Sequence, residues 1–475
     1  MRYRELAEQI IRDIQADRLH GGSKMPSLRK AASLYDVSMT TAINCYRMLE
    51  EGGWIIARPQ SGFYVAKPEV AQPTPQPPQF RSRLRSIATG RMVPTQQRAL
   101  SEGGPLSLSM VSPELMPTAA LQRSVKRGLK RLGDNIHLYP PAQGDRFLRT
   151  ALEQHFAGYG FPFKADELVI ANGCADAVRV ALETVSAPGD GIAISSPYFS
   201  GLLQLLAEMR RKVVEIPCTA EGIDLDQLEF HLNKGSVAAG LFNTTHMNPQ
   251  GISLSVAQKQ RLAELANRYR VPIIEDDVYF ELGHGRATPL PAKYWDRNGY
   301  LLWCGSISKT LSASFRLGWC LPGRYQAAYQ RRATTDKYGI SWLMQTALAD
   351  FIDSGEYRTH LQKLRVQLAR HIRDYRDFLA ARLPDGAAIS NPEGGTVLWL
   401  QIPGLNAKAL QVEAERAGLD LRYGTSFTAL DLYSDCVRIN AGWPLDEHIA
   451  KMLDQFCKLT ERHRQLSAGA EKQVG

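Results

Sequence analysis

The sequence predicts two unlike parts: a small helical unit ending in two short strands, then a large α/β region with a smaller α+β lobe. The first observation is length, since 475 residues exceed one ordinary domain. The second is the stretch 1–66, where apolar residues recur at helical spacing. The third is residues 105–475, where short apolar strands alternate with amphipathic helices. That alternation is typical of a mostly parallel sheet covered on both faces.

Residues 1–66 are expected to form three helices and a hairpin. Leu6, Ile10 and Ile14 repeat at helical spacing and predict the first helix. The second is expected from Leu28 to about Tyr35 and the third over Met39–Glu51, each after a serine that can cap it. The third helix should turn an apolar stripe inward and leave its polar groups free to meet a partner. The stripe is Ala42, Ile43, Tyr46 and Leu49, and the polar groups are Thr40, Thr41, Asn44 and Arg47.

Two short strands around a turn follow the third helix. Trp54–Arg58 leads through Pro59–Gly62 into Phe63–Val65. Helices followed by such a wing form the winged helix-turn-helix plan, in which one helix enters the DNA major groove while nearby groups hold phosphates. Small three-helix bundles also serve as dimerisation modules, which is the alternative interpretation.

The same unit resembles the DNA-binding domain of GntR-type regulators. The resemblance rests on Gly22-Ser23-Lys24-Met25-Pro26-Ser27-Leu28-Arg29 and on Thr40-Thr41-Ala42-Ile43-Asn44-Cys45-Tyr46. It implies a double-stranded DNA operator as partner. The implied contact residues are Arg29, Ser38, Thr40, Thr41, Arg47, Arg58 and Gly62. The chain departs at Met39, where many relatives carry Arg, so the bases that are read stay open.

Composition adds weaker indications. A net charge of +9 and a pI near 9.1 suit nucleic-acid contact, and solubility explains the same surplus equally well. The seven cysteines show no paired spacing, which favours reduced thiols over disulfides or a metal site. No signal core and no apolar run of membrane-spanning length is present. These features predict a soluble cytoplasmic protein.

Residues 67–100 are predicted to be a linker, because prolines lie among glutamines and arginines follow them. Its arginines could add non-specific attraction to phosphates, but a plain tether is the favoured interpretation.

In the second region we expect seven strands joined mainly by helices. They are Leu168–Ala171, Gly191–Ser195, Val213–Ile216, Gly240–Phe242, Pro272–Glu275, Leu301–Cys304 and Gly318–Leu321. The large part should cover about 130–345, and the small α+β lobe about 101–129 and 346–475.

The most informative feature of this region is Lys309, in Ser306-Ile307-Ser308-Lys309-Thr310, followed by Arg316. Upstream, the apolar run Pro272–Glu275 ends in Asp276-Asp277-Val278-Tyr279. Pyridoxal phosphate requires a lysine for a Schiff base, hydroxyls and an arginine for its phosphate, and a carboxylate for its pyridinium nitrogen. The combination therefore predicts a pyridoxal phosphate site.

The region also resembles fold-type I, aspartate aminotransferase-like enzymes over nearly its whole length. The motifs are Asn172-Gly173-Cys174-Ala175, Pro197-Tyr198-Phe199, Asn248-Pro249-Gln250-Gly251 and Val437-Arg438-Ile439. By resemblance, Lys309 carries the cofactor, Asp276 holds its ring nitrogen, and Tyr279 and Asn248 share its phenolic oxygen. Gly173, Cys174, Ser306, Ser308 and Arg316 bind its phosphate, Phe199 stacks on its ring, Tyr139 reaches the phosphate of a neighbouring subunit, and Arg438 grips an effector carboxylate. No metal is implied.

The order of domains resembles the MocR-type regulators. That resemblance implies a head-to-tail homodimer, in which each DNA-binding domain packs against its partner's large domain, and a transcription factor that senses pyridoxal phosphate or an amine or amino acid. An active aminotransferase that also binds DNA is the alternative, because the set Lys309, Asp276, Tyr279 and Arg438 is intact. A purely structural cofactor is a third interpretation.

Overall fold

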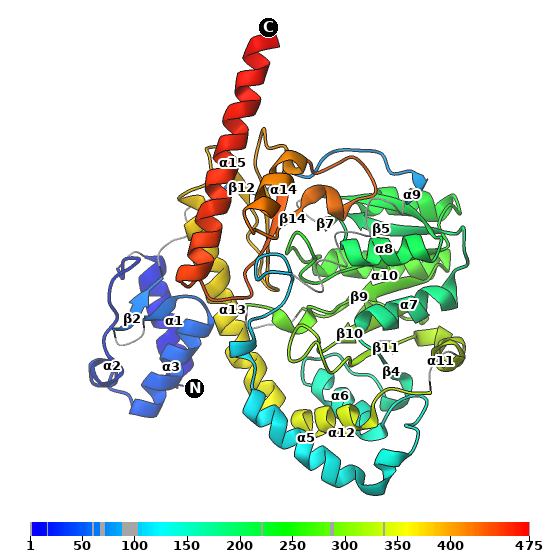
Figure 1. Ribbon diagram of the computed structural model, residues 1–475. Coiled ribbons are helices and arrows are strands. Elements are labelled where there is room, and N and C mark those ends of the chain that lie inside the picture. Colours follow the sequence, from blue (N-terminus) through cyan, green and yellow to red (C-terminus); the bar gives the residue numbers. More distant parts are fainter. Residues whose placement is uncertain are drawn as a thin grey trace. The chain divides into compact units, whose positions relative to one another are not determined.

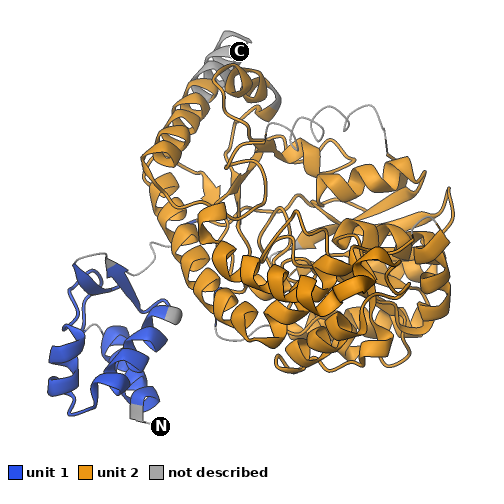
Figure 2. Ribbon diagram, turned by 60° about the horizontal axis from the view of Figure 1, so that its bottom comes forward, with its two compact units in different colours: residues 1–72, 284–287 blue, residues 73–283, 288–475 orange. Residues whose placement is uncertain are grey.

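The computed structural model describes residues 2–16, 18–58, 61–66, 72–87, 103–219, 222–285, 289–335 and 338–474. The chain divides into two compact units, coloured separately in Figure 2. One comprises residues 1–72 and 284–287, and the other residues 73–283 and 288–475.

The described residues of the first unit form three helices and a two-stranded wing, as predicted (Figure 1). Its elements are α1 (Arg2–Gln15), α2 (Leu28–Leu34), α3 (Met39–Glu51), β1 (Ile55–Arg58) and β2 (Gly62–Val65). Helices α1 and α2 pack on α3 around buried Leu6, Ile10 and Tyr46. The strands pair antiparallel, with Arg58 opposite Gly62 next to the turn.

The predicted inward stripe of α3 was wrong at one position. Ile43 is 45% exposed, whereas Cys45 is fully buried. The buried side chains Ala42, Cys45, Tyr46 and Leu49 follow the i, i+3, i+4, i+7 pattern of one helix face. Ile43 lies about 100° away from Ala42 around the helix axis and therefore faces outward.

The second unit is built on one large sheet and a smaller one. The described strands of the large sheet are β3 (Leu84–Ser86), β4 (Val169–Ala171), β5 (Gly191–Ser196), β6 (Lys212–Thr219), β7 (Gly222–Ile223), β8 (Ala239–Phe242), β9 (Ile273–Asp276), β10 (Leu301–Ser306) and β11 (Gly318–Leu321). Their order is β3-β6-β5-β8-β9-β10-β11-β4, with β7 paired to β6. The central strands β6, β5, β8, β9 and β10 are parallel, and β3, β11 and β4 join antiparallel. All seven expected strands are present, with ends shifted by a few residues.

Both faces of this sheet are covered, which confirms the predicted fold class (Figure 1). Ile192 and Ile194 of β5 pack in one apolar cluster with α7 and α8, whereas Ala193 belongs to another with α9 and α10. The α-helices of the unit within the described residues are α5 (Thr118–Leu132), α6 (Arg146–Ala157), α7 (Cys174–Val185), α8 (Ser200–Glu208), α9 (Leu225–Asn233), α10 (Val256–Tyr269), α11 (Gln326–Thr335), α12 (Trp342–Asp353), α13 (Glu356–Ala380), α14 (Ala407–Arg416) and α15 (Glu447–Val474).

The smaller sheet belongs to the α+β lobe and is antiparallel in the order β12-β13-β15-β14. Its strands are β12 (Ala388–Ile389), β13 (Val397–Gln401), β14 (Arg422–Tyr423) and β15 (Cys436–Asn440). Leu398, Ile439 and residues of α14 and α15 form its apolar core. Among the described helices of the whole chain, none has the length and apolar character to cross a membrane.

Part of the predicted linker is bound to the second unit rather than acting as a plain tether. Strand β3 pairs with β6, and Ile389 donates its backbone N–H to Pro73 O at 2.8 Å. Gly191 makes room for this strand, since a Cβ there would lie 2.7 Å from Leu84 Cδ1. Residues 67–71 and 88–100 of the predicted linker lie outside the described residues.

Candidate functional site

The predicted cofactor residues lie where the central strands end. Asp276 ends β9, and Ser306 ends β10 beside it. Because β11 and β4 run antiparallel at this edge, Ser306, Gly318 and Ala171 lie in one row across three strands. The carboxyl ends of parallel strands are the usual place for ligands in such sheets.

Lys309 lies just after β10 and points toward a segment that sequence reasoning missed. Its Nζ donates to the backbone oxygen of Ser109 at 2.5 Å and lies 5.9 Å from the ring centroid of Tyr279. Thr310, the next residue, contacts Tyr357 Oη at 2.8 Å, and Tyr357 donates to the buried Glu281 carboxylate at 2.7 Å. The turn that carries the lysine is therefore held from behind by a buried polar network.

Three further predicted residues form a hydrogen-bonded chain beside Lys309, and Ser109 contacts both the chain and the lysine. Asn248 Nδ2 donates to Tyr279 Oη at 3.2 Å, and Arg438 donates to Asn248 Oδ1 at 3.1 Å. The Tyr279 hydroxyl also contacts Ser109 Oγ at 2.7 Å. The structure thus gathers side chains from the loop after β8, the loop after β9 and strand β15 of the small lobe.

Arg438 is buried at the centre of this group. It donates to the backbone oxygen of Ser107, and its Nε is buried without a hydrogen-bond partner among the described atoms. Burial lowers the pKa of its guanidinium to about 10, against the opposing effect of the Tyr279 hydroxyl. A buried arginine with an N–H that has no hydrogen-bond partner can bind a carboxylate.

Asp276 is buried at the floor of the site. The Cys174 thiol donates to its Oδ1 at 3.0 Å, and Asn243 donates to its backbone oxygen. Burial raises the pKa of this carboxyl, while the hydrogen bond from Cys174 lowers it. The carboxylate is therefore fixed in a poorly solvated position, where a cationic ring nitrogen would stabilise its charged form.

The two aromatic residues after β5 differ in their surroundings. Tyr198 is buried, and its hydroxyl has no hydrogen-bond partner among the described atoms. Burial raises its pKa, and the Asp276 charge adds to this. Phe199, the predicted stacking residue, is half-buried and precedes α8.

The predicted phosphate residues form a cradle at the start of α7. Gly173 has φ +84°, and a Cβ there would lie 2.5 Å from a guanidinium nitrogen of Arg316. Arg316 donates to Asn172 O at 3.0 Å, and Ser306 Oγ contacts Ser308 Oγ at 2.8 Å. Backbone amides at a helix N-terminus, two hydroxyls and an arginine are suited to an anion. The close approach of Arg316 to Gly173 leaves no room for a side chain there, which supports the same conclusion.

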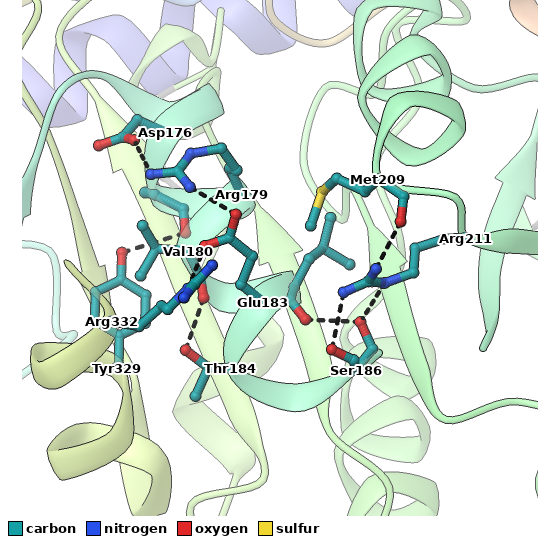
Figure 3. Close-up of polar contacts among 12 residues, drawn as sticks. Asp176, Arg179, Val180, Glu183, Thr184, Ser186, Met209, Arg211, Tyr329 and Arg332 are labelled. Carbon is teal, nitrogen blue, oxygen red and sulfur yellow. Dashed lines mark hydrogen bonds and ion pairs between the residues drawn. The ribbon is translucent and has the colours of Figure 1, made fainter. Parts of the chain in front are cut away.

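Ion pairs hold α7 in place behind this cradle (Figure 3). Arg179 pairs with Asp176 at 3.2 Å and with Glu183 at 2.7 Å, and Arg332 of α11 reaches Glu183 at 2.7 Å. Asp176 also accepts the backbone N–H of Asn172 at 3.0 Å. These contacts fix the helix whose first turn would face the phosphate.

Tyr139 is not part of this group. It is 77% exposed, and its ring lies 5.6 Å from that of Tyr338, which is 84% exposed. Its predicted role concerns a neighbouring subunit and stays a prediction.

The predicted DNA-contact residues lie on α2, α3 and the wing of the first unit. Ser38 caps α3, since its Oγ accepts the backbone N–H of Thr41 at 3.1 Å and contacts Thr41 Oγ1 at 2.9 Å. Arg29, Thr40 and Arg47 are exposed. Gly62 has φ +99° at the start of β2, and the side chain of Arg58 lies outside the described residues.

Sequence reasoning missed Ser107 and Ser109, as well as the bond from Cys174 to Asp276. The two serines lie in an irregular stretch before α5 that carries no motif. Cys174 was expected at the phosphate, and the pairing of its thiol with Asp276 joins residues that are 102 positions apart.

Known families match both units. Residues 2–65 match the bacterial regulatory proteins of the gntR family, and residues 103–455 match aminotransferase class I and II. The HTH-type transcriptional regulator YdcR of Escherichia coli (strain K12) is 35% identical over 97% of this chain and 99% of its own length. The probable rhizopine catabolism regulatory protein MocR of Rhizobium meliloti is 24% identical over 83% of this chain and 80% of its own.

The fold of the second unit recurs in a solved enzyme. Kynurenine aminotransferase of Pyrococcus horikoshii, crystallised with PMP, matches with a TM-score of 0.71 at 22% identity, over 77% of this chain and 93% of that one.

Proposed function

The chain belongs to the MocR-type transcriptional regulators, with a gntR-family DNA-binding domain and an aminotransferase class I and II domain, and on this premise we propose that the second domain is a sensor. It binds pyridoxal phosphate through Lys309, and it responds to pyridoxal phosphate itself or to an amine or amino acid. The observation that carries the proposal is that Tyr279, Asn248 and Arg438 form a hydrogen-bonded chain and that Lys309 Nζ lies 5.9 Å from the Tyr279 ring.

The residues present fit this cofactor. Gly173, the hydroxyls of Ser306 and Ser308, and Arg316 would hold its phosphate, and Asp276 would hold a proton at its ring nitrogen. When bound, pyridoxal phosphate supplies an aldehyde that captures amines and a ring that withdraws electrons. Asn248 and Tyr279 would orient the phenolic oxygen of the cofactor ring, because the hydrogen bond between these two side chains already holds them next to each other.

Lys309 and Arg438 are both engaged by one short segment. Lys309 donates to Ser109 O, and Arg438 donates to Ser107 O. An effector carboxylate would replace Ser107 O at Arg438, because a charged acceptor binds a buried guanidinium more strongly than a carbonyl does. Such a ligand would favour one arrangement of the small lobe, and it changes DNA binding only if the two arrangements hold DNA differently.

The exposure of Tyr139 supports a homodimer. An exposed tyrosine in tilted ring contact with another exposed tyrosine, with Leu138 61% exposed beside it, suits burial against a second copy. As a DNA-binding regulator, the dimer would act in the cytoplasm.

A working aminotransferase is the second candidate. The observation that favours it is the completeness of the set, since Lys309, Asp276, Tyr279 and Arg438 are all present. Tyr279 and Arg438 both contact Asn248, and Lys309 Nζ lies 5.9 Å from the Tyr279 ring.

Visible absorption of the full-length protein tests these candidates. Pyridoxal phosphate is added first, then amino acids and simple amines, with Lys309→Ala as control. A band that depends on Lys309 and shifts lastingly with one ligand supports the sensor. If an amino donor removes the band, a keto acid restores it, and this cycle repeats over many turnovers, the result supports the aminotransferase. No band after addition of cofactor contradicts both.

A further inference from the structure

An apolar patch lies on the outer face of α3, the helix that corresponds to the DNA-reading helix of the gntR family. Met39 is 41% exposed and Ile43 is 45% exposed, at positions i and i+4 of the helix. These residues are neighbours on one face. Single exposed apolar residues are common, but two neighbouring ones on a helix face outside the unit's own core are available for contact with a partner.

The rest of α3 leaves these two side chains in a position to read bases. The adjoining buried face of the helix is fixed by Ala42, Cys45 and Tyr46, which pack against α1 and α2, and Tyr46 Oη donates to Pro26 O at 2.8 Å. Met39 is the first residue of the helix, and Ile43 lies one turn later. In helix-turn-helix proteins the N-terminal residues of this helix are the ones that reach base edges.

The polar neighbours are suited to other tasks. The Thr41 hydroxyl is engaged with Ser38 at the helix cap. Asn44 Oδ1 accepts a hydrogen bond from Arg47 at 3.1 Å, one turn further along. The outer face of α3 therefore carries two apolar side chains beside the exposed Thr40 in its first turns and a cation at Arg47, which suits base contact at one end and phosphate contact at the other.

We propose that Met39 and Ile43 determine operator specificity by packing against thymine 5-methyl groups in the major groove. Thymine is the only base of normal DNA that presents a methyl group there, and apolar side chains are its usual partners. An arginine at position 39 would instead pair with guanine, so methionine changes both the partner base and the type of contact. The proposal rests on DNA binding by α3, which is itself part of the proposed contact set.

The test uses full-length protein and duplexes selected from a random DNA pool. Each thymine of the selected site is then replaced singly by uracil, which removes only the 5-methyl group. We expect about a fourfold loss of affinity at one or two positions in each half-site, since burying one methyl group is worth about 0.8 kcal/mol. Each of these penalties should disappear in Met39→Ala or in Ile43→Ala, whichever removes the side chain that contacts that methyl group, although the overall affinity falls.

Leu34→Ala is the matched control. Leu34 is an exposed apolar residue of the same unit, 61% exposed, but it lies on α2. Its variant should keep the wild-type response to uracil at every position. Both variants in α3 replace exposed side chains with alanine, a strong helix former, so circular dichroism should show an unchanged fold.

Four results overturn the proposal. They are selected sites without recurrent thymines, uracil replacements with no effect anywhere, a uracil penalty that persists in both α3 variants, and variants that change only the oligomeric state. Failure to select any duplex would contradict DNA binding by this domain, and with it the premise, so the two failures are distinguishable.

Discussion

In the first unit several side chains predicted to meet DNA are exposed, whereas in the second unit two central residues of the predicted cofactor and effector site are buried and hydrogen-bonded to neighbouring site residues. Arg29, Thr40 and Arg47 lie on the surface, and each can be replaced without disturbing a core. Asp276 and Arg438 are buried and share partners with neighbouring site residues. Substitutions should therefore act nearly independently in the first unit and strongly together in the second.

The largest effect should come from closing the phosphate cradle. Gly173→Ala places a Cβ 2.5 Å from Arg316 and forces an L-residue to φ +84°. We expect affinity for pyridoxal phosphate to fall at least about 100-fold, because the arginine and the loop must both move. Quenching of protein fluorescence by the cofactor measures this.

Gly189→Ala is its control, since Gly189 has φ +94° and a Cβ there would meet no atom within 4 Å. It carries the same backbone strain without the collision and should keep cofactor affinity within about threefold. Equal losses in both variants would show that backbone strain, rather than the cradle, is responsible.

A second effect should appear as acid sensitivity of the second unit. Burial on α13 lowers the pKa of His371 from 6.5 to about 4, so the folded state keeps this imidazole neutral. The unfolded chain takes up the proton first as pH falls. Stability is therefore fully present above about pH 6.5 and declines as pH falls toward 4, by a few kcal/mol. Urea unfolding of His371→Gln should show a flatter dependence over this range, and an unchanged slope would contradict the assignment.

Single substitutions on the DNA-facing surface should have smaller and more uniform effects. Arg29→Ala should weaken DNA binding about tenfold for all sequences alike and reduce the salt slope by about one. Arg268, on the surface of the second unit with its side chain 62% exposed, is the control, and Arg268→Ala should leave both values unchanged. A sequence-selective loss in Arg29→Ala would assign this residue to base contact instead.

The smallest effect is expected at the ion pairs behind the cradle. Arg332→Ala removes an ion pair with Glu183. The Arg332 side chain is 43% exposed, so solvent screens this ion pair. Stability should fall by less than about 1 kcal/mol, measured by thermal unfolding. A loss of several kcal/mol would mean that α7 depends on this contact far more than its exposure implies.

The sequence predicts more of the fold than of the contacts within the site. Helix α3 begins and ends where its serine cap and paired glycines placed it, and strands such as Gly318–Leu321 match because buried strands are short apolar runs between turn residues. The error at Ile43 arose because an apolar residue was assumed to be buried, although exposed apolar residues are common.

Within the site, motifs placed the residues that lie next to a strand end, such as Asp276 and Lys309. They did not reveal Ser107, Ser109 or the thiol of Cys174 as partners of site residues, because these contacts join segments far apart in sequence. Two of these contacts are made by backbone oxygens, which no residue type specifies.

The most direct measurement is the affinity of the full-length protein for one selected duplex in three states: free of cofactor, loaded with pyridoxal phosphate, and loaded and saturated with the amine that shifts its absorption. The sensor proposal predicts that affinity differs between these states by at least about fivefold, and that Lys309→Ala abolishes the difference. Equal affinity in all three states would contradict the proposal, even if the absorption band responds to the amine.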